Sequence, residues 1–562
     1  MTGRPKHSTA LEIASKPKPL TFVDLFCGCG GFSLGLQRAG FQCLAALDFN
    51  KEAMTVFRAN FPDVPNALEK DLTKFPPAKL AALLGGTEVD VIVGGPPCQG
   101  FSTVRQVDAA NHGSRVRRDK RRYLYREFLR YVQFFQPRIF VMENVLGIQS
   151  AAKGRFFTRV QAEARALGYR VHPQVEEAWT LGVPQKRRRQ LIIGVRTDVP
   201  GFFPTQLIPA ERAWFNFDAP DDVPTLWDAI GDLPKLGAGG GVEECEYDLS
   251  LRSTFLARRG KRGAHYLRSV LEIDRASKLT AHCARPHNDQ DLRDFARLKE
   301  GEHCAEAIAR GEAMEFTYKR DIFKDRYKRQ HREKLCSTIV AHLSKDGLMF
   351  IHPTQNRSLT PREAARVQSF PDWFQFPVAR THQFRIIGNA VPPLVGEAVA
   401  REVSEFLKNA MKKHPQPQFD LAPLPMDEDE AISWLLPLLD KDSRTLRKVA
   451  PDDFKRAWYS IGFLYMGLHP DGALDHGKTI SSKIEDYPLT SRIEPRLLAP
   501  YYERSGWPVV LAPVAREAWR RYEAEALGDD EFYCSEAQMA GICHRSPELA
   551  EEVCAERTAL LA

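Results

Sequence analysis

The first part of the chain alternates short apolar runs with longer segments in which apolar residues recur every three or four positions. Short runs bounded by turn residues predict strands, and the periodic segments predict helices that bury one face. The predicted strands occupy residues 22–26, 44–47, 89–93, 139–142 and 191–195, and helices are predicted at 32–39 and 125–135. This alternation is typical of an α/β domain with a doubly wound, mostly parallel sheet, whose ligands bind at the carboxyl ends of the strands.

The pattern weakens beyond residue 200 and returns near residue 360. The glycine cluster at 237–241 interrupts any regular element, and basic and aromatic residues mix in TYKRDIFKDRYKRQHR (317–332). After residue 360 the pattern predicts a helix over PREAARVQSF, and a GNAVPP turn then precedes a second, longer helix.

The C-terminal part differs in composition from the rest. Residues 412–430 hold four prolines followed by an acidic run, which is typical of a linker. The pattern of residues 431–562 is mainly helical, and four tryptophans are candidates for a core: Trp434, Trp458, Trp507 and Trp519. We therefore predict a small accessory domain at 431–562.

Composition narrows the class of protein further. A hydrophobic content of 43% and a charged content of 27% are ordinary for a globular protein, and no run of 18 consecutive apolar residues predicts a membrane span. Residues 1–20 are basic and polar without the apolar centre of a secretory signal, so we expect a disordered tail. The 11 scattered cysteines form no disulfide framework and favour the reduced cytoplasm. The net charge of +7 is small for 562 residues, so its placement matters more than its sum.

A glycine-rich turn follows the first predicted strand in VDLFCGCGGFSLGL (23–36). Gly28, Gly30 and Gly31 let the backbone turn tightly and approach a ligand. A glycine loop alone is also compatible with a purely structural turn. The loop is not GxGxxG and lacks a Lys-Ser/Thr phosphate clamp, so a nucleoside without pyrophosphate is the favoured ligand.

Acidic and aromatic residues follow the next strands at positions suited to a nucleoside. Asp48 ends the second predicted strand, where an acidic residue typically binds ribose hydroxyls. Phe49 follows it and suits stacking on an adenine ring. Asp71 is placed to accept a hydrogen bond from the adenine amino group.

A cysteine stands directly behind two glycines and two prolines in GGPPCQGFS (94–102). The prolines fix the backbone and remove two donors, so Cys98 is expected to project from a stiff turn at a strand end. A cysteine nucleophile has to be positioned and has to reach its thiolate form. The alternative is a buried, inert cysteine.

Two further segments bring ionisable groups to the predicted edge. The predicted strand in RIFVMENV (138–145) ends in Glu143-Asn144. Glu143 follows four apolar residues and is expected to lie partly desolvated beside Cys98, suited to donate a proton. Its alternative role is to bond the start of the following turn. In GVPQKRRRQLIIG, alternation along a strand places Gln185, Arg187 and Arg189 on one side.

Together these segments resemble the cytosine-C5 DNA methyltransferases. The resemblance rests on DLFCGCGG, GGPPCQGFS, ENV, QKRRR, REAARVQSFP and GNAVPP, which occur in the order usual for the family over about residues 20–410. It implies a catalytic domain at 21–200 that is completed by 361–411, with a target-recognition region at 201–360 between the two parts.

The resemblance also implies S-adenosylmethionine as the methyl donor. The residues expected to contact this cofactor are Asp24, Phe26, Gly28, Gly30, Gly31, Asp48, Phe49, Asp71, Pro96 and Asn389. The implied reaction begins when the Cys98 thiolate adds to C6 of cytosine while Glu143 protonates N3, so that C5 attacks the methyl group. Arg187 and Arg189 are expected to stabilise the base oxygen and the thiolate region.

The substrate implied is duplex DNA with one cytosine rotated out of the helix. Position after the nucleophile favours the family's active-site loop for the strongly basic segment 115–122, although a solvated helix start is the alternative. The expected DNA contacts are Gln99, Ser102, Arg115, Arg117, Arg118, Lys120, Arg121, Arg122 and Gln185. Segment 317–332 is expected to form part of the recognition region.

Several alternatives stay open on the sequence. An RNA cytosine methyltransferase and a non-catalytic DNA-binding scaffold are the competing functions. The histidines and cysteines near residues 282–304 match no standard zinc spacing, so no metal is expected. Fold-level analogy favours a monomer that acts on DNA in bacterial restriction–modification or phage defence, with 431–562 docking a defence partner or positioning DNA.

Overall fold

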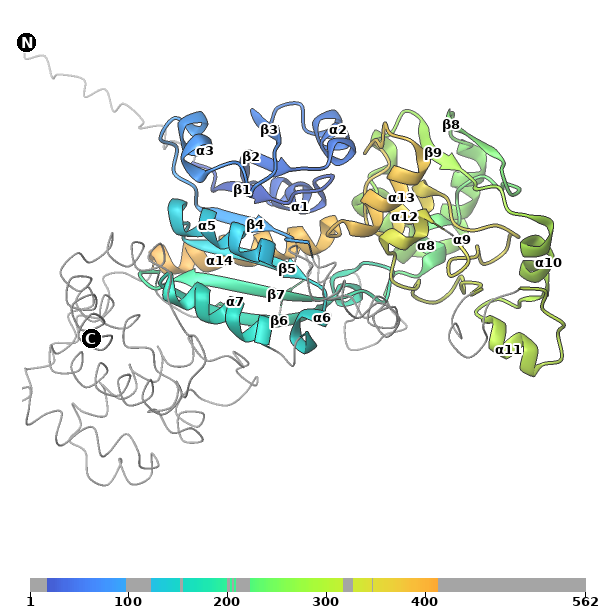
Figure 1. Ribbon diagram of the computed structural model, residues 1–562. Coiled ribbons are helices and arrows are strands. Elements are labelled where there is room, and N and C mark those ends of the chain that lie inside the picture. Colours follow the sequence, from blue (N-terminus) through green and yellow to red (C-terminus); the bar gives the residue numbers. More distant parts are fainter. Residues whose placement is uncertain are drawn as a thin grey trace, which may run out of the picture.

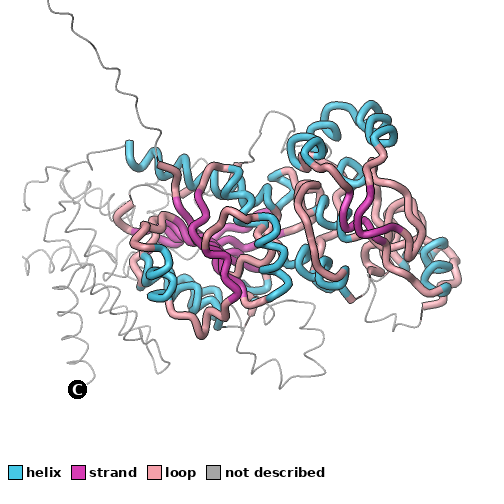
Figure 2. The backbone as a smooth tube through the Cα atoms, turned by 90° about the horizontal axis from the view of Figure 1, so that it is seen from above, coloured by secondary structure: helices cyan, strands magenta, loops and turns pink. Residues whose placement is uncertain are grey.

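The computed structural model describes residues 18–97, 123–151, 155–199, 203–204, 207–208, 223–316, 327–345 and 347–412. These residues form two lobes, one around a large sheet and one made mostly of helices and loops (Figures 1 and 2). None of the helices in these ranges is long and apolar enough to cross a membrane.

The first lobe is built on a seven-stranded sheet of order β3-β2-β1-β4-β5-β7-β6. Its strands are β1 (Thr21–Leu25), β2 (Gln42–Asp48), β3 (Asn66–Glu69), β4 (Val91–Gly94), β5 (Ile139–Asn144), β6 (Tyr169–Glu177) and β7 (Arg188–Arg196). The strands from β3 to β5 pair in parallel, whereas β7 is antiparallel to both of its neighbours. Six strands therefore share one direction, and only β7 runs the opposite way.

Helices cover both faces of this sheet. They are α1 (Gly31–Arg38), α2 (Lys51–Asn60), α3 (Pro77–Leu84), α5 (Leu124–Phe135), α6 (Gly147–Ser150), α7 (Arg155–Ala166) and α14 (Pro393–Lys412). Buried side chains of α1, α2 and α14 form one core with the sheet, and those of α3, α5 and α7 form a second core. This is the doubly wound, mostly parallel α/β architecture that the alternating pattern predicted.

The second lobe follows in the chain and lies beside the carboxyl ends of the strands (Figure 1). It contains β8 (Gly241–Cys245), β9 (Leu279–Cys283), α8 (Leu226–Ile230), α9 (Leu249–His265), α10 (Asp289–Arg297), α11 (Cys304–Ala309), α12 (Pro361–Val367) and α13 (Arg380–Asn389). Strands β8 and β9 pair antiparallel. Both α12 and α13 pack within this lobe, so only α14 of the returning stretch lies against the large sheet.

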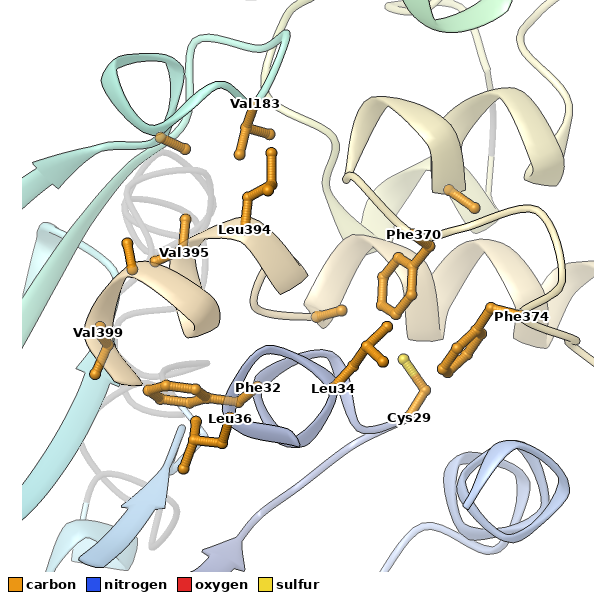
Figure 3. Close-up of a cluster of buried hydrophobic side chains, with 14 of the residues drawn as sticks. Cys29, Phe32, Leu34, Leu36, Val183, Phe370, Phe374, Leu394, Val395 and Val399 are labelled. Carbon is orange, nitrogen blue, oxygen red and sulfur yellow. The ribbon is translucent and has the colours of Figure 1, made fainter. Parts of the chain in front are cut away.

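Helix α14 packs closely on α1, the helix that follows the glycine loop. A Cβ at Gly35 would lie 2.4 Å from the backbone nitrogen of Glu397, so only glycine permits this approach. Around this contact Phe32 and Leu36 of α1 lie near Val399 of α14, and Leu34 and Cys29 lie near Phe370 and Phe374 (Figure 3). The core is therefore continuous from the sheet through α1 to Phe370 and Phe374, which follow α12.

The five strands predicted from the sequence coincide with β1, β2, β4, β5 and β7, with ends that differ by a few residues. Strands β8 and β9 of the second lobe were missed, as were β3 and β6 of the large sheet. Strands β3 and β6 are both edge strands, and β3 has only four residues, none of them fully buried. Strand β6 contains Pro173, which an edge strand tolerates because it pairs on one side only.

Candidate active site

Several of the predicted residues meet at the carboxyl edge of the large sheet. Phe26 follows β1, Asp48 ends β2, and Gly95 and Pro96 follow β4. Glu143 lies at the end of β5. Because β7 runs in the opposite direction, its first residues, not its last, join this same edge.

Asp48 holds the glycine loop. The backbone N–H of Gly28 donates to Oδ2 of Asp48 at 3.0 Å, and that of Asn50 donates to Oδ1 at 2.8 Å. Burial raises the pKa of Asp48, and these backbone hydrogen bonds oppose that rise. Phe26 and Gly28 both have φ of 57°, the left-handed region. Apart from its chain neighbours, no atom of the described residues lies within 4 Å of a Cβ built on Gly28. The loop therefore keeps open space at Gly28 and a strained backbone at Phe26, where a ligand can approach.

The other glycines of this loop serve packing within the protein. A Cβ at Gly30 would lie 2.4 Å from the Phe61 ring, and a Cβ at Gly31 would lie 2.1 Å from the carbonyl oxygen of Val391. The need for glycine at these two positions is thus explained without a ligand. Their predicted cofactor contact has no support in this placement beyond their membership of the loop.

Asp24 lies within β1, one residue before its end, and is not exposed at the carboxyl edge of the sheet. The side chain is buried, and its Oδ2 accepts a 2.6 Å hydrogen bond from Ser33 Oγ on α1. Burial raises the pKa of Asp24 to about 7. The carboxyl group therefore braces the first turn of α1, and the cofactor contact predicted for Asp24 is not what this placement favours.

An exposed aromatic ring and an exposed carboxylate stand further along the edge. Phe49 is 63% exposed although phenylalanine is among the residues most often buried. Asn50 Oδ1 caps that helix, α2, by accepting from the N–H of Ala53 at 2.8 Å. Asp71 Oδ1 accepts from the N–H and the hydroxyl of Thr73 at 3.0 and 2.7 Å. The carboxylate of Asp71 is thus held by Thr73, and the exposed Phe49 ring offers a flat face to a ligand.

Glu143 and Arg189 form an ion pair at the end of β5. Arg189 Nε donates to Glu143 Oε1 at 2.8 Å, and the side chains are 16% and 12% exposed. The second oxygen, Oε2, lies 3.3 Å from where a Cβ on Gly95 would stand, so the turn after β4 passes close to the carboxyl group.

Asn144 secures the same turn, a role that the sequence analysis did not assign to it. Its Nδ2 donates to the carbonyl oxygen of Pro96 at 3.3 Å, and its Oδ1 accepts from the N–H of Val145. In the sequence, only the position of Asn144 beside Glu143 in the ENV segment pointed to it. Cys98, Gln99 and Ser102 follow this turn and lie outside the described residues.

Gln185 and Arg187 do not line the edge beside Arg189, which differs from the expectation of a shared strand face. Strand β7 begins only at Arg188, and both side chains turn into the protein. Arg187 donates to the carbonyl oxygens of Ile339 and Ala390 at 2.9 and 2.8 Å. The catalytic role of Arg187 and the DNA contact of Gln185 therefore lack support, because protein groups surround both side chains.

These two residues belong to a buried network with Gln368, at the end of α12. Gln185 Nε2 donates to Gln368 Oε1 at 2.6 Å, and Gln368 Nε2 donates to the carbonyl oxygen of Ile387 at 2.7 Å. The network fixes the end of α13, where Asn389 is exposed. Gln368 was visible in the sequence only as part of the REAARVQSFP segment.

The remaining predicted contacts fall into two groups. The basic segment 115–122 lies outside the described residues, as do 317–326. Of segment 317–332, Tyr327 and Arg329 are buried, and Arg329 donates to the carbonyl oxygens of Phe295, Leu298 and His352. These two residues hold the second lobe together, so they do not offer a base-reading surface in this placement.

The histidines near residue 282 are occupied by protein partners. His282 Nδ1 lies 3.1 Å from Thr360 Oγ1, and its Nε2 lies 3.0 Å from the carbonyl oxygen of Pro234. In the part of the chain that the structure describes, no three potential ligand side chains are grouped to hold a metal ion.

Comparisons with known proteins match the part of the chain that forms the two lobes. A family model described as C-5 cytosine-specific DNA methylase matches residues 20–405. The Type II methyltransferase M.DdeI of Desulfomicrobium norvegicum is 34% identical over 407 residues, covering 69% of this chain and 90% of its own. M.AgeI of Thalassovita gelatinovora, also a Type II methyltransferase, is 33% identical and covers 68% of this chain and 98% of its own.

A solved structure is similar to the same part of the chain. It is that of a protein assigned as a DNA modification methyltransferase from an Escherichia coli prophage, with a TM-score of 0.53 and 26% identity. The match covers 69% of this chain and 99% of the other.

Proposed function

The chain belongs to the C-5 cytosine-specific DNA methylases, and from that premise we propose that it methylates C5 of cytosine in a specific sequence of duplex DNA with S-adenosylmethionine. The observation that carries the proposal is the Glu143–Arg189 ion pair beside the Gly95–Pro96 turn, which leads in sequence to Cys98. A carboxyl group and an arginine at a turn that leads in sequence to a candidate nucleophile suit covalent attack on an electron-poor ring.

The residues at the sheet edge fit the proposed cofactor. The exposed Phe49 ring suits stacking on adenine, and Asp71 suits hydrogen bonding to its amino group. Asp48 lies between the glycine loop and Phe49, where its carboxylate can accept from ribose hydroxyls while it holds Gly28. Asn389, Pro96 and the backbone at Phe26 and Gly28 complete the proposed contacts. When bound, S-adenosylmethionine supplies an electrophilic methyl group on a sulfonium.

The proposed reaction starts with a cytosine rotated out of the duplex, which costs a few kcal/mol of pairing and stacking. The Cys98 thiolate adds to C6, and Glu143 gives a proton to N3 as the ring loses its aromaticity. C5 then acts as an enamine-like carbon and takes the methyl group, with S-adenosylhomocysteine as the leaving group. Return of the N3 proton to Glu143, loss of the C5 proton to a base and elimination of the Cys98 thiolate restore the ring.

Arg189 has a distinct part in this scheme. Its Nε fixes one oxygen of Glu143, so that Oε2 remains directed toward the turn at Gly95. A carboxyl group held in one orientation can meet N3 of a flipped base without a further conformational search. The guanidinium also places positive charge where the base oxygen gains electron density.

The proposed biological role is modification in a bacterial restriction–modification or phage-defence system. Its support is that M.DdeI and M.AgeI, which the chain resembles over most of their length, are named as Type II methyltransferases. We infer that the enzyme acts as a monomer on DNA in the cytoplasm.

The test is to express the full chain in cells that lack cytosine methylation and to map modified cytosines by bisulfite sequencing. Purified enzyme is then given S-adenosylmethionine with a labelled methyl group and either duplex DNA or transfer RNA. We expect label in duplex DNA within one sequence context. Label in transfer RNA alone would favour the RNA enzyme, and DNA binding without any transfer would favour the non-catalytic scaffold.

A further inference from the structure

Helix α5 is tied to the loop between β3 and α3, which carries Asp71. Two adjacent residues of α5 make the connection. Arg130 Nη2 donates to the carbonyl oxygens of Leu72 and Phe75, the latter at 3.2 Å, and the Tyr131 hydroxyl donates to the Phe75 carbonyl at 2.7 Å. Three hydrogen bonds from one helix therefore satisfy two carbonyl groups of one loop.

These hydrogen bonds satisfy backbone groups that lie outside the strands and helices. A loop outside the sheet has no ladder to satisfy its backbone groups, so side-chain donors fix its path. Tyr131 is fully buried, and burial raises the pKa of its phenol above the ordinary value, so it stays protonated and remains a donor. The Phe75 ring on the same loop also meets Lys70, whose Nζ lies 5.9 Å from the ring centroid.

Asp71 is coupled to α5 through charge as well as through the backbone. It directly precedes Leu72, whose carbonyl group Arg130 holds. Burial raises the pKa of Glu127 on α5, Arg130 opposes that rise, and the Asp71 carboxylate adds to it. Arg130 Nη2 lies 2.8 Å from Glu127 Oε2. Arg130 thus opposes, at Glu127, the repulsion from the Asp71 carboxylate while it fixes the loop.

We propose that Arg130 and Tyr131 are positioning residues for adenine recognition by Asp71. They fix the loop so that the carboxylate meets the exocyclic amino group of the cofactor. The inference rests on the proposed function, which gives Asp71 that contact. In this proposal Arg130 and Tyr131 contact neither the cofactor nor DNA, but they affect which ligand the site selects.

The consequence is a loss of selectivity for the amino group. S-inosylhomocysteine carries an oxygen where S-adenosylhomocysteine carries the amino group, so a well-placed carboxylate disfavours it. If Asp71 moves, the ratio of the two dissociation constants falls toward one. A residue that only stabilises the fold would instead weaken both ligands by the same factor.

The experiment is isothermal titration calorimetry of the full chain with both ligands. For Arg130→Met we expect the ratio of dissociation constants to fall about tenfold, and for Tyr131→Phe by a few fold, because fewer hydrogen bonds are lost. Arg126→Met is the matched control, since Arg126 lies on the same helix but pairs with Glu163 at 2.7 Å. Its ratio should equal that of the wild type.

A double variant completes the test. Asp71→Ala should lower the ratio by itself, and Arg130→Met added to it should lower the ratio no further, because both act on one contact. Unchanged ratios in Arg130→Met and Tyr131→Phe, with a lowered ratio in Asp71→Ala, would overturn the positioning role and leave the proposed function standing. Equal binding of both ligands by the wild type would overturn the adenine contact itself.

Discussion

Arg189 reaches Glu143 because the strands that carry them run in opposite directions. Glu143 pairs in register with Leu191, so Arg189 stands two residues away on the same face and donates to Glu143 Oε1 at 2.8 Å. In a parallel strand the first residues would lie at the far edge of the sheet. The reversal of β7 therefore brings the arginine to the carboxyl edge.

Replacing Glu143 by Gln is expected to slow methyl transfer by about 100- to 10,000-fold, the usual value of general acid catalysis. Transfer slows because glutamine cannot act as an acid. Glutamine still offers an acceptor to Arg189, so the site keeps its shape and the affinity for S-adenosylhomocysteine should hardly change. Single-turnover transfer and calorimetry check this. Glu177→Gln is the control, because Glu177 forms the neighbouring exposed pair with Arg188 at 3.1 Å. Collapse of cofactor binding would show that Glu143 is structural.

Replacing Cys98 by Ser or Ala should abolish transfer while DNA binding survives, because the charged contacts remain. Wild-type enzyme should form a covalent adduct with duplex DNA that carries 5-fluorocytosine at the target, since loss of a C5 proton is blocked. Denaturing gels and peptide mass spectrometry locate the adduct. Cys245→Ser, in the second lobe, should behave as wild type. An adduct on any other residue would refute the assignment.

Substitution of the arginines and lysines at 115–122 should weaken DNA binding without changing the methylated sequence. Each lost phosphate contact should lower the log–log salt slope by roughly 0.9. Binding measured over a salt series checks this, followed by mapping of the modified sites. Arg293→Ala is the control, because Arg293 already pairs with Glu315 at 2.7 Å. A changed recognition sequence would place this segment in base readout.

Asp24 makes the stability of the fold depend on pH. Its folded pKa of about 7 is raised above the ordinary 3.8 by burial, so only the folded state holds the proton between these values. The contribution of Asp24 to the free energy of unfolding is therefore fully present below about pH 4, and it is lost as the pH rises toward 7. Asp24→Asn should lack this part of the slope in urea unfolding measured between pH 4 and 8. An identical slope in both proteins would contradict the assignment.

A chain truncated after residue 412 should stay soluble, bind S-adenosylmethionine and methylate the same sequence. The family match ends at residue 405, and α14 closes the core against α1 before residue 412. Residues 431–562 would then act as a docking or DNA-positioning domain. Thermal melting of both chains, with and without cofactor, checks the prediction. Aggregation, or a melting temperature that cofactor no longer raises, would make the tail part of the catalytic unit.

The sequence alone was enough for the fold class and the family. Strands β1, β4 and β5 are buried along their whole length and largely apolar, because parallel strands covered on both faces need no polar side. Stiff or glycine-rich turns follow the first two, and Glu143 is the last residue but one of the third, so the local pattern was enough to predict this edge. The cofactor and DNA contacts beyond this edge stay predictions, as do those at Cys98 and 115–122.

Tertiary structure decided what the individual side chains do. Gln185, Arg187 and Arg189 alternate in sequence, yet the strand starts at Arg188, so the first two turn inward and only Arg189 reaches Glu143. Gly31 resembles Gly28 in sequence, but a carbonyl group from Val391 fills the space beside it. The local pattern of residues determines where strands, helices and turns form. Only packing between segments far apart in the chain determines whether a polar group meets the protein or a ligand.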